Sequence, residues 1–123
     1  MKPGWAYIVA VALCLGLSVY SLIDASEAVV YEGIYDLGFE DSTFKPCRRA
    51  EAWTIITGDE EAVREFARRT FTVTEQGNNP MYVRLRGRVS RKGRYDGLFT
   101  TYDRQLAVTE VLEVRPIEEG DCQ

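Results

Sequence analysis

The residues best suited to chemistry are a run of basic side chains followed closely by aromatic ones. Arg84, Arg86 and Arg88 alternate along one predicted strand, so their guanidinium groups would share one face. Guanidinium groups beside aromatic rings bind anions and stack on flat groups, which would suit a phosphorylated glycolipid or an acidic patch on a partner. The same arginines could instead form a solvated face that is balanced by acidic residues on neighbouring strands. The complete candidate set for ligand or partner binding is Arg84, Arg86, Arg88, Arg91, Lys92, Arg94, Tyr95, Phe99 and Tyr102.

The chain has no histidine, which restricts the reactions it could catalyse. Histidine is the usual general base at neutral pH and the commonest transition-metal ligand in proteins. Its absence excludes Ser–His and Cys–His hydrolases as well as histidine-ligated zinc sites. We therefore predict no catalytic residue, no metal site and no cofactor, and keep a small carboxylate-dependent enzyme as an alternative.

Two cysteines lie outside the first 28 residues, Cys47 and Cys122. In an oxidising compartment, two cysteines in a small domain most often form a disulfide. Closing a loop of about 75 residues would add roughly 4 kcal/mol of stability in the chain-entropy treatment. Two free thiols, or a metal site that would need other ligands, are the alternatives. Trp53, which lies near Phe44 and Cys47 in the sequence, is expected to pack in the core rather than to form a ligand platform.

The first 28 residues resemble an export signal or a membrane anchor. Lys2 precedes an uncharged, mostly apolar run at 6–23, and the first acidic residue is Asp24. This run is longer than the usual signal-peptide hydrophobic region of about 7–15 residues and reaches the lower limit of a membrane-spanning helix. Small residues just before position 29 would permit cleavage there; otherwise the run would stay as an anchor in the inner membrane. In both cases residues 29–123 are expected outside the cytoplasm, in the periplasm or at the cell envelope.

The exported part is large enough for one small domain. The whole chain has 15 basic and 19 acidic residues, of which Lys2, Asp24 and Glu27 belong to the leader. The remaining 14 basic and 17 acidic residues give a net charge of −3. Strong non-specific binding to nucleic acid requires a basic surplus, so the composition argues against nucleic acid as a partner.

Hydrophobic periodicity predicts five strands and one helix in the exported part. Apolar residues alternate with polar ones in the strands and recur at helical spacing in the helix. Val63, Phe66, Ala67 and Thr70 would form the apolar stripe of the helix, and the chain from 70 to 74 is expected to be extended. The predicted strands are 29–39, 43–47, 52–57, 81–89 and 105–114, and the helix is 59–69, with a capping-box signature at 57–60.

The same alternation assigns individual side chains to faces of the strands. Phe39 shares the inward face of the first strand, whereas Tyr82 faces outward with the arginines. Leu112 shares the inward face of the last strand, and Glu110 falls on that face too. Burial would raise the pKa of the Glu110 carboxyl and allow it to act as an acid, whereas a rim position, a bulge or an arginine partner would not.

The order of these elements indicates a mainly β fold. A long bent first strand that contains a glycine, Gly33, and a helix between the third and fourth strands are arranged as in an OB-fold. We therefore predict an OB-fold-like β-barrel of five strands with one helix between strands 3 and 4, preceded by an N-terminal hydrophobic helix. Another small barrel, or an open sheet with one helix, is the alternative.

Two stretches of sequence resemble known proteins. One is Gly33-x-Tyr35-x-x-Gly38-Phe39-Glu40-x-Ser42-x-Phe44-x-Pro46-Cys47, followed by Glu51 and Trp53. The other is Val83-x-Leu85-x-Gly87-x-Val89, which leads to Tyr102-Asp103-Arg104 and Val108. Together they resemble small uncharacterised exported bacterial proteins and, more distantly, the OB-fold domains of cell-envelope lipoproteins such as NlpE. The resemblance implies a fold and a compartment, and it implies no reaction.

The sequence thus favours a non-catalytic binding or interaction domain that is exported or anchored at the cell envelope. An envelope protein or an anionic ligand would be its partner, with the membrane as a further contact if residues 6–23 are retained. An OB-fold that binds single-stranded nucleic acid is a second alternative, against which the leader and the net negative charge weigh.

Overall fold

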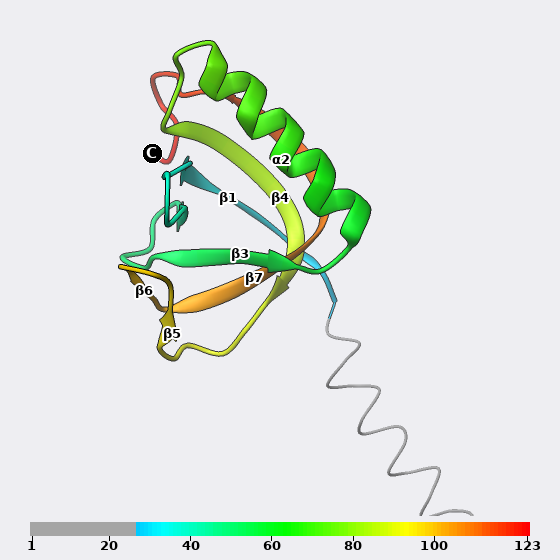
Figure 1. The fold of residues 1–123 in the computed structure, drawn as a ribbon, viewed down its shortest axis with the longest axis vertical. Coiled ribbons are helices and arrows are strands. Elements are labelled where there is room, and N and C mark those ends of the chain that lie inside the picture. Colours follow the sequence, from blue (N-terminus) through cyan, green and yellow to red (C-terminus); the bar gives the residue numbers. More distant parts are fainter. Residues whose placement is uncertain (1–26) are drawn as a thin grey trace, which may run out of the picture.

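The structure, a computed structural model, describes residues 27–123 (Figure 1). The predicted signal peptide or anchor at 1–28 therefore lies outside the described residues apart from its last two. Within residues 27–123, no helix has the length and apolar character needed to cross a membrane.

Five strands form a closed barrel in the order β1-β2-β3-β7-β4. Neighbouring strands are antiparallel except for β3 and β7, which are parallel. A single helix, α2, connects β3 to β4, so the predicted mainly β, OB-fold-like barrel is confirmed. A separate two-stranded hairpin, β5-β6, lies in the connection between β4 and β7, where no strand was predicted. The elements are β1 (Val29–Asp36), β2 (Thr43–Pro46), β3 (Trp53–Thr57), α2 (Glu60–Glu75), β4 (Met81–Val89), β5 (Tyr95–Asp96), β6 (Thr101–Tyr102) and β7 (Arg104–Pro116).

The core fills the barrel and the space beneath α2, which covers one side of it (Figure 1). Strand β4 shows the pattern most clearly, because its alternate residues Met81, Val83 and Leu85 are fully buried. Burying a side chain of this size contributes about 1.5–3 kcal/mol. The core cluster consists of Tyr35, Phe44, Trp53, Ala62, Phe66, Val73, Met81, Val83, Leu85, Leu106 and Val108.

Gly33 lies where β1 begins to pair with strands on both of its sides. It pairs with Val83 of β4 and with Pro46 of β2. A Cβ atom at this position would overlap the carbonyl oxygen of Lys45, so the close approach of the two backbones requires glycine.

The helix is longer than predicted and begins one residue later. Asp59 is its N-cap, and the Asp59 carboxylate accepts a hydrogen bond from the Ala62 N–H at 3.0 Å. The expectation that 70–74 is extended is wrong, because Thr70 and Val73 are buried and continue the helical stripe. The stripe is Ala62, Phe66, Thr70 and Val73 rather than the predicted set; Ala67 is exposed and Val63 is half-buried. Packing overrides the weak helix propensity of the β-branched residues near its end.

Three predicted side-chain positions are also corrected. β1 ends at Asp36, and Phe39 beyond it is fully exposed. Tyr82 does lie on the outer face of β4, but it is buried because the Arg115 guanidinium covers its ring at 4.1 Å. In β7, irregular pairing with β4 shifts the alternation, so that Val111 rather than Leu112 packs against the core.

A disulfide between Cys47 and Cys122 connects the end of β2 to the C-terminal tail. The Cα atoms of the two cysteines are 4.8 Å apart, and the predicted pairing is confirmed. Asp121 holds the same tail, since its carboxylate accepts two hydrogen bonds from the Arg115 guanidinium at 2.8 and 3.0 Å. The tail is thereby fixed to the barrel by one covalent bond and one bidentate ion pair.

Candidate functional site

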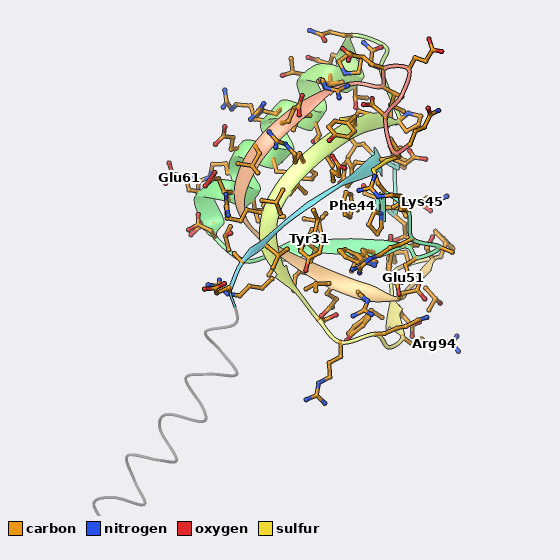
Figure 2. All side chains as sticks on the ribbon, turned by 180° about the vertical axis from the view of Figure 1, so that it is seen from behind. Tyr31, Phe44, Lys45, Glu51, Glu61 and Arg94 are labelled. Atoms are coloured by element: carbon orange, nitrogen blue, oxygen red, sulfur yellow. A yellow bond between two sulfur atoms is a disulfide. The ribbon has the colours of Figure 1, made fainter. Side chains whose placement is uncertain are left out.

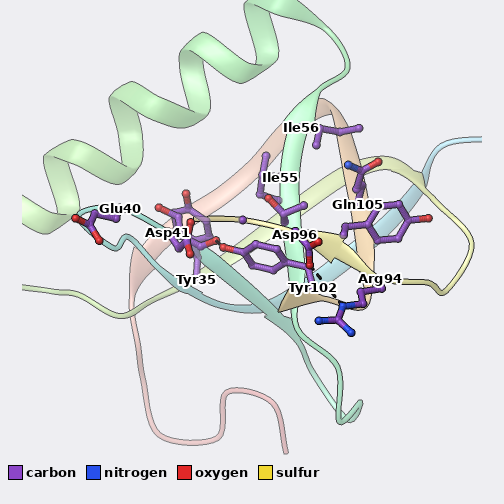
Figure 3. A pocket seen from close by; sticks show the side chains of 13 residues that line it. Tyr35, Glu40, Asp41, Ile55, Ile56, Arg94, Asp96, Tyr102 and Gln105 are labelled. Atoms are coloured by element: carbon purple, nitrogen blue, oxygen red, sulfur yellow. Dashed lines mark hydrogen bonds and ion pairs between the residues drawn. The ribbon is translucent and has the colours of Figure 1, made fainter. Parts of the chain in front are cut away.

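A pocket of about 650 Å³ lies beside β3, between two loops that are far apart in the sequence (Figure 3). We call it the β3 pocket. One wall is loop A, residues 37–42 between β1 and β2, and the other is loop B, residues 90–103, which contains β5 and β6. The lining residues are Tyr35, Glu40, Asp41, Ser42, Thr54, Ile55, Ile56, Arg94, Tyr95, Asp96, Gly97, Tyr102 and Gln105.

Asp41 joins the two loops through main-chain hydrogen bonds. Its carboxylate accepts from the N–H groups of Leu98 at 2.9 Å, Phe99 at 2.6 Å and Thr100 at 2.8 Å. These donors lower the pKa of the Asp41 carboxyl below its ordinary value. Gly97 makes the approach possible, because a Cβ there would lie 2.8 Å from an Asp41 carboxylate oxygen. Both walls of the pocket are therefore held in one arrangement.

Two tyrosines stiffen the inner side of the β3 pocket. The Tyr102 hydroxyl donates to the carbonyl oxygen of Ser42 at 2.7 Å, which is a second link between loops A and B. The Tyr35 ring packs edge-on against Phe66 beneath the helix, with ring centroids 4.8 Å apart. Burial raises the pKa of both Tyr35 and Tyr102 above the ordinary value.

One edge of β3 faces this pocket. β3 pairs with β7 along its whole length, from Trp53 to Thr57. On its other side it pairs with β2 only through Phe44 and Trp53. In the described part of the chain, the rest of this edge has no strand beside it, and Thr54, Ile55 and Ile56 line the pocket.

Some ionisable side chains of the β3 pocket already have partners within the protein. The guanidinium of Arg94 lies 3.6 Å from the Asp96 carboxylate, in an exposed ion pair. Asp41 is bound to loop B as described above. Glu40 is exposed. The pocket therefore has a net negative lining.

The predicted basic set divides into two groups in the structure. Arg94, Tyr95 and Tyr102 line the β3 pocket, and Phe99 projects from the same loop B with an exposed side chain. The hydroxyl of Tyr95 donates to the Arg91 carbonyl oxygen at 2.8 Å and braces that loop.

The remaining members lie outside the pocket, and three of them lie close to acidic residues. Arg84 lies 3.6 Å from Glu113, and Arg86 lies 3.8 Å from Glu110. Lys92 lies 3.9 Å from Glu51, and Arg88 shares the exposed face of β4. These pairs favour the balanced, solvated face over a dedicated anion site. Glu110 is thus exposed beside an irregular step in the pairing and next to Arg86, which agrees with the predicted bulge or arginine partner and excludes a buried acid.

Trp53 is a core residue, as predicted, and its polar atom is held by Glu51. The side chain is fully buried, and its indole N–H donates to the Glu51 carboxylate at 2.8 Å. The same carboxylate accepts from the Arg104 guanidinium at 3.0 Å. These hydrogen bonds lower the pKa of the Glu51 carboxyl. Figure 2 shows Glu51 at the end of the barrel from which Arg94 also projects.

Sequence reasoning missed the part of the site that loop A and β3 provide. Asp41 and Ser42 indicated only a turn, because a lone aspartate in a loop does not reveal which amides it will bind. Thr54 and Ile56 indicated only a strand. Within residues 27–123, no group of three or more His, Cys, Asp or Glu side chains could hold a metal ion.

No protein-family model, curated protein or solved structure matches the chain. The resemblance to exported bacterial proteins and envelope lipoproteins thus rests on short motifs, and the structure supports the OB-fold-like barrel that it implied.

Proposed function

We propose that this chain is a non-catalytic binding domain that works outside the cytoplasm, exported or anchored at the cell envelope, and binds its ligand in the β3 pocket. The position of the pocket carries this proposal. OB-folds bind their ligands beside strands 2 and 3, between the loop that joins strands 1 and 2 and the loop that joins strands 4 and 5. Loops A and B occupy these two places in the barrel, and the pocket lies between them.

The chemistry of the lining supports binding. Gln105 supplies an amide, Glu40 supplies a carboxylate, and Ile55 and Ile56 supply apolar surface. Polar groups that converge on one pocket fix the orientation of a ligand, and the apolar groups beside them add contact area. Because Asp41 fixes loops A and B before any ligand enters, little ordering is needed on binding.

The proposed compartment is supported by two independent features. The Cys47–Cys122 disulfide is typical of proteins in oxidising surroundings. The apolar run at 6–23 is typical of an export signal or anchor.

The intact mass of the native protein, measured with and without reduction and alkylation, tests both the disulfide and the leader. A mass that starts near Val29, with two cysteines alkylated only after reduction, means export with cleavage. A mass from Met1, with Cys14 alkylated without reduction and two further cysteines alkylated only after it, means an anchored domain. Alkylation of Cys47 and Cys122 without reduction contradicts the compartment.

Ligand titration followed by NMR tests the pocket itself. The full-length, ¹⁵N-labelled chain in detergent micelles is titrated in turn with short peptides, oligosaccharides, oligothymidylate and inorganic phosphate. We expect one of these probes to shift the amide signals of Ile56, Gly97 and Gln105. Thr54→Arg, which fills the pocket, should abolish the shifts, whereas Thr72→Arg on the exposed side of α2 should not. Shifts confined to the β4 face around Arg84 and Arg86 would instead indicate an anion site there.

A further inference from the structure

We propose that the β3 pocket receives an extended peptide segment of a partner protein, which pairs as an additional strand with the open edge of β3. This inference rests on the proposed function, since it names the class of ligand for the same pocket. It follows from the main chain of β3 and from the side chains on either side of it.

The strand pairing leaves a place for another strand. Phe44 of β2 pairs with Trp53, the first residue of β3. Past this point the two segments separate, because the chain that precedes β2 is loop A and forms the far wall of the pocket. The open edge therefore runs from Thr54 to Thr57, about 13 Å at the rise of a strand.

An open strand edge carries the hydrogen-bonding groups that a peptide needs. In a strand, alternate residues direct their backbone N–H and C=O groups to opposite edges. Those of β3 that point away from β7 therefore face the pocket. Edges of this kind bind extended peptides through main-chain hydrogen bonds, while pockets beside them select alternate side chains.

The two loops that form the walls of the pocket carry exposed apolar side chains at their tips. Phe39 of loop A is fully exposed, and Leu98 and Phe99 of loop B are 73 % and 79 % exposed. Asp41 binds the backbone of Leu98 and Phe99 and lies two residues from Phe39, so it holds both apolar tips at the same end of the barrel. Isolated apolar residues on a surface are ordinary, but neighbouring ones on two joined loops are typical of an interaction site.

The charge of the pocket indicates which peptides would bind. Glu40 lines the pocket and is exposed, while the other acids in the lining are bound to loop B or to Arg94. A lysine or arginine of the incoming strand would pair with the Glu40 carboxylate. The occupant is thus an extended segment with apolar side chains and one basic residue.

Peptide selection with a backbone-specific control tests this inference. Peptides are selected on the full-length chain in detergent micelles from a phage-displayed library of random twelve-residue sequences. The strongest binder is then synthesised in two N-methylated forms, each blocking one alternate set of its amide groups. In one form the blocked N–H groups are those that would pair with β3, and in the other form they are those that would face away from it. We expect one form to bind about tenfold more weakly or worse, because two or three hydrogen bonds are lost, and the other to bind nearly as well as the parent peptide.

Two further readouts locate the contact. Hydrogen exchange at the amides of β3 should slow on peptide binding. Glu40→Lys should weaken binding of a basic peptide, whereas Glu119→Lys in the exposed tail should leave it unchanged.

Several outcomes would overturn strand addition. The first is equally weak binding of the two N-methylated peptides, and the second is dimerisation of the chain through β3 in the absence of peptide. The third is binding of the apolar tips to lipid vesicles with no peptide selected. The fourth is binding of a sugar or nucleotide in the pocket with no peptide selected. The last outcome leaves the proposed function standing, and a peptide bound at a site other than the pocket contradicts both.

Discussion

The carboxylate of Asp41 accepts a hydrogen bond from the backbone N–H of Phe99 at 2.6 Å, across 58 positions of sequence. With the Leu98 and Thr100 amides it binds three consecutive N–H groups. A hydrogen bond to a charged acceptor is roughly twice as strong as one between neutral groups. This one side chain therefore sets the relative position of loops A and B and, with it, the width of the β3 pocket.

Asp41→Ala should release loop B. We expect faster hydrogen exchange at the amides of Leu98, Phe99 and Thr100, with exchange in β4 unchanged, because the barrel does not depend on this contact. Asp36→Ala, which removes an exposed carboxylate at the end of β1, is the control. Equal exchange in wild type and Asp41→Ala would show that loop B is held by other contacts.

Acid should have the same effect on loop B. The pKa of Asp41 is lowered by the amides of loop B, so the folded state binds its proton less tightly than the unfolded state does. The stabilisation is complete above the ordinary aspartate pKa of 3.8 and is lost as the pH falls through the lowered value. Exchange at Phe99, corrected for its intrinsic pH dependence, should rise in this range for wild type and stay flat for Asp41→Ala.

Glu51→Ala should destabilise the barrel by about 1–3 kcal/mol. The change leaves the fully buried Trp53 with an indole N–H that has lost its acceptor, and an unsatisfied buried donor costs roughly this much. Urea unfolding of the full-length chain followed by circular dichroism measures the difference. Glu119→Ala in the exposed tail should unfold at the wild-type urea concentration. A Glu51→Ala midpoint equal to that of Glu119→Ala would mean that water replaces the carboxylate without cost.

Reduction of the Cys47–Cys122 disulfide should lower the free energy of unfolding by roughly 2–4 kcal/mol. The bond closes a loop of 75 residues and restricts the unfolded chain. The double variant Cys47→Ala/Cys122→Ala should unfold like the reduced wild type and should not respond to reductant. A wild type that is equally stable with and without reductant would contradict a stabilising role for the bond.

Tyr82 should make the protein sensitive to alkali. Burial and the hydrogen bond that its hydroxyl donates to Glu32 at 2.5 Å raise the pKa of Tyr82 to about 12. Because the folded-state pKa lies above the ordinary value of 10, this contribution to stability is complete below pH 10 and is lost as the pH rises through about 12. Tyr82→Phe should show a weaker loss of stability over this range in urea unfolding than wild type. Tyr95→Phe is the control, and a Tyr82→Phe profile identical to wild type would rule out this source.

The arginines on the outside of β4 should be dispensable for binding in the β3 pocket. Arg86 and Glu110 form an exposed ion pair, and such pairs contribute about 0–1 kcal/mol. Arg86→Glu should therefore cost at most about 1 kcal/mol, and the swap Arg86→Glu/Glu110→Arg should recover it. Peptide affinity measured on the same variants should stay at the wild-type value. A loss of peptide affinity in both variants would instead support the predicted anion site on β4.

Much of the architecture could be predicted from local pattern. Alternation along 81–89 and helical spacing after 59 are strong signals, because each strand or helix must bury one face. The disulfide followed from the number of cysteines and the leader. Prediction failed where tertiary contacts compete with local preference. Helix α2 continues through Thr70 because Val73 packs in the core. Tyr82 is buried because Arg115 of the neighbouring strand β7 covers its ring.

The sequence by itself thus determined the β-barrel class, the disulfide partners and the core face of β4, since these depend on spacing and composition. Only the tertiary structure decided where the candidate site lies. The β3 pocket arises because strands β2 and β3 separate after one residue pair and because a carboxylate in loop A binds amides 57 to 59 positions away in loop B. Neither the length of a pairing nor the partner of a loop aspartate is contained in a local pattern, because both are set by how the closed barrel brings distant segments together.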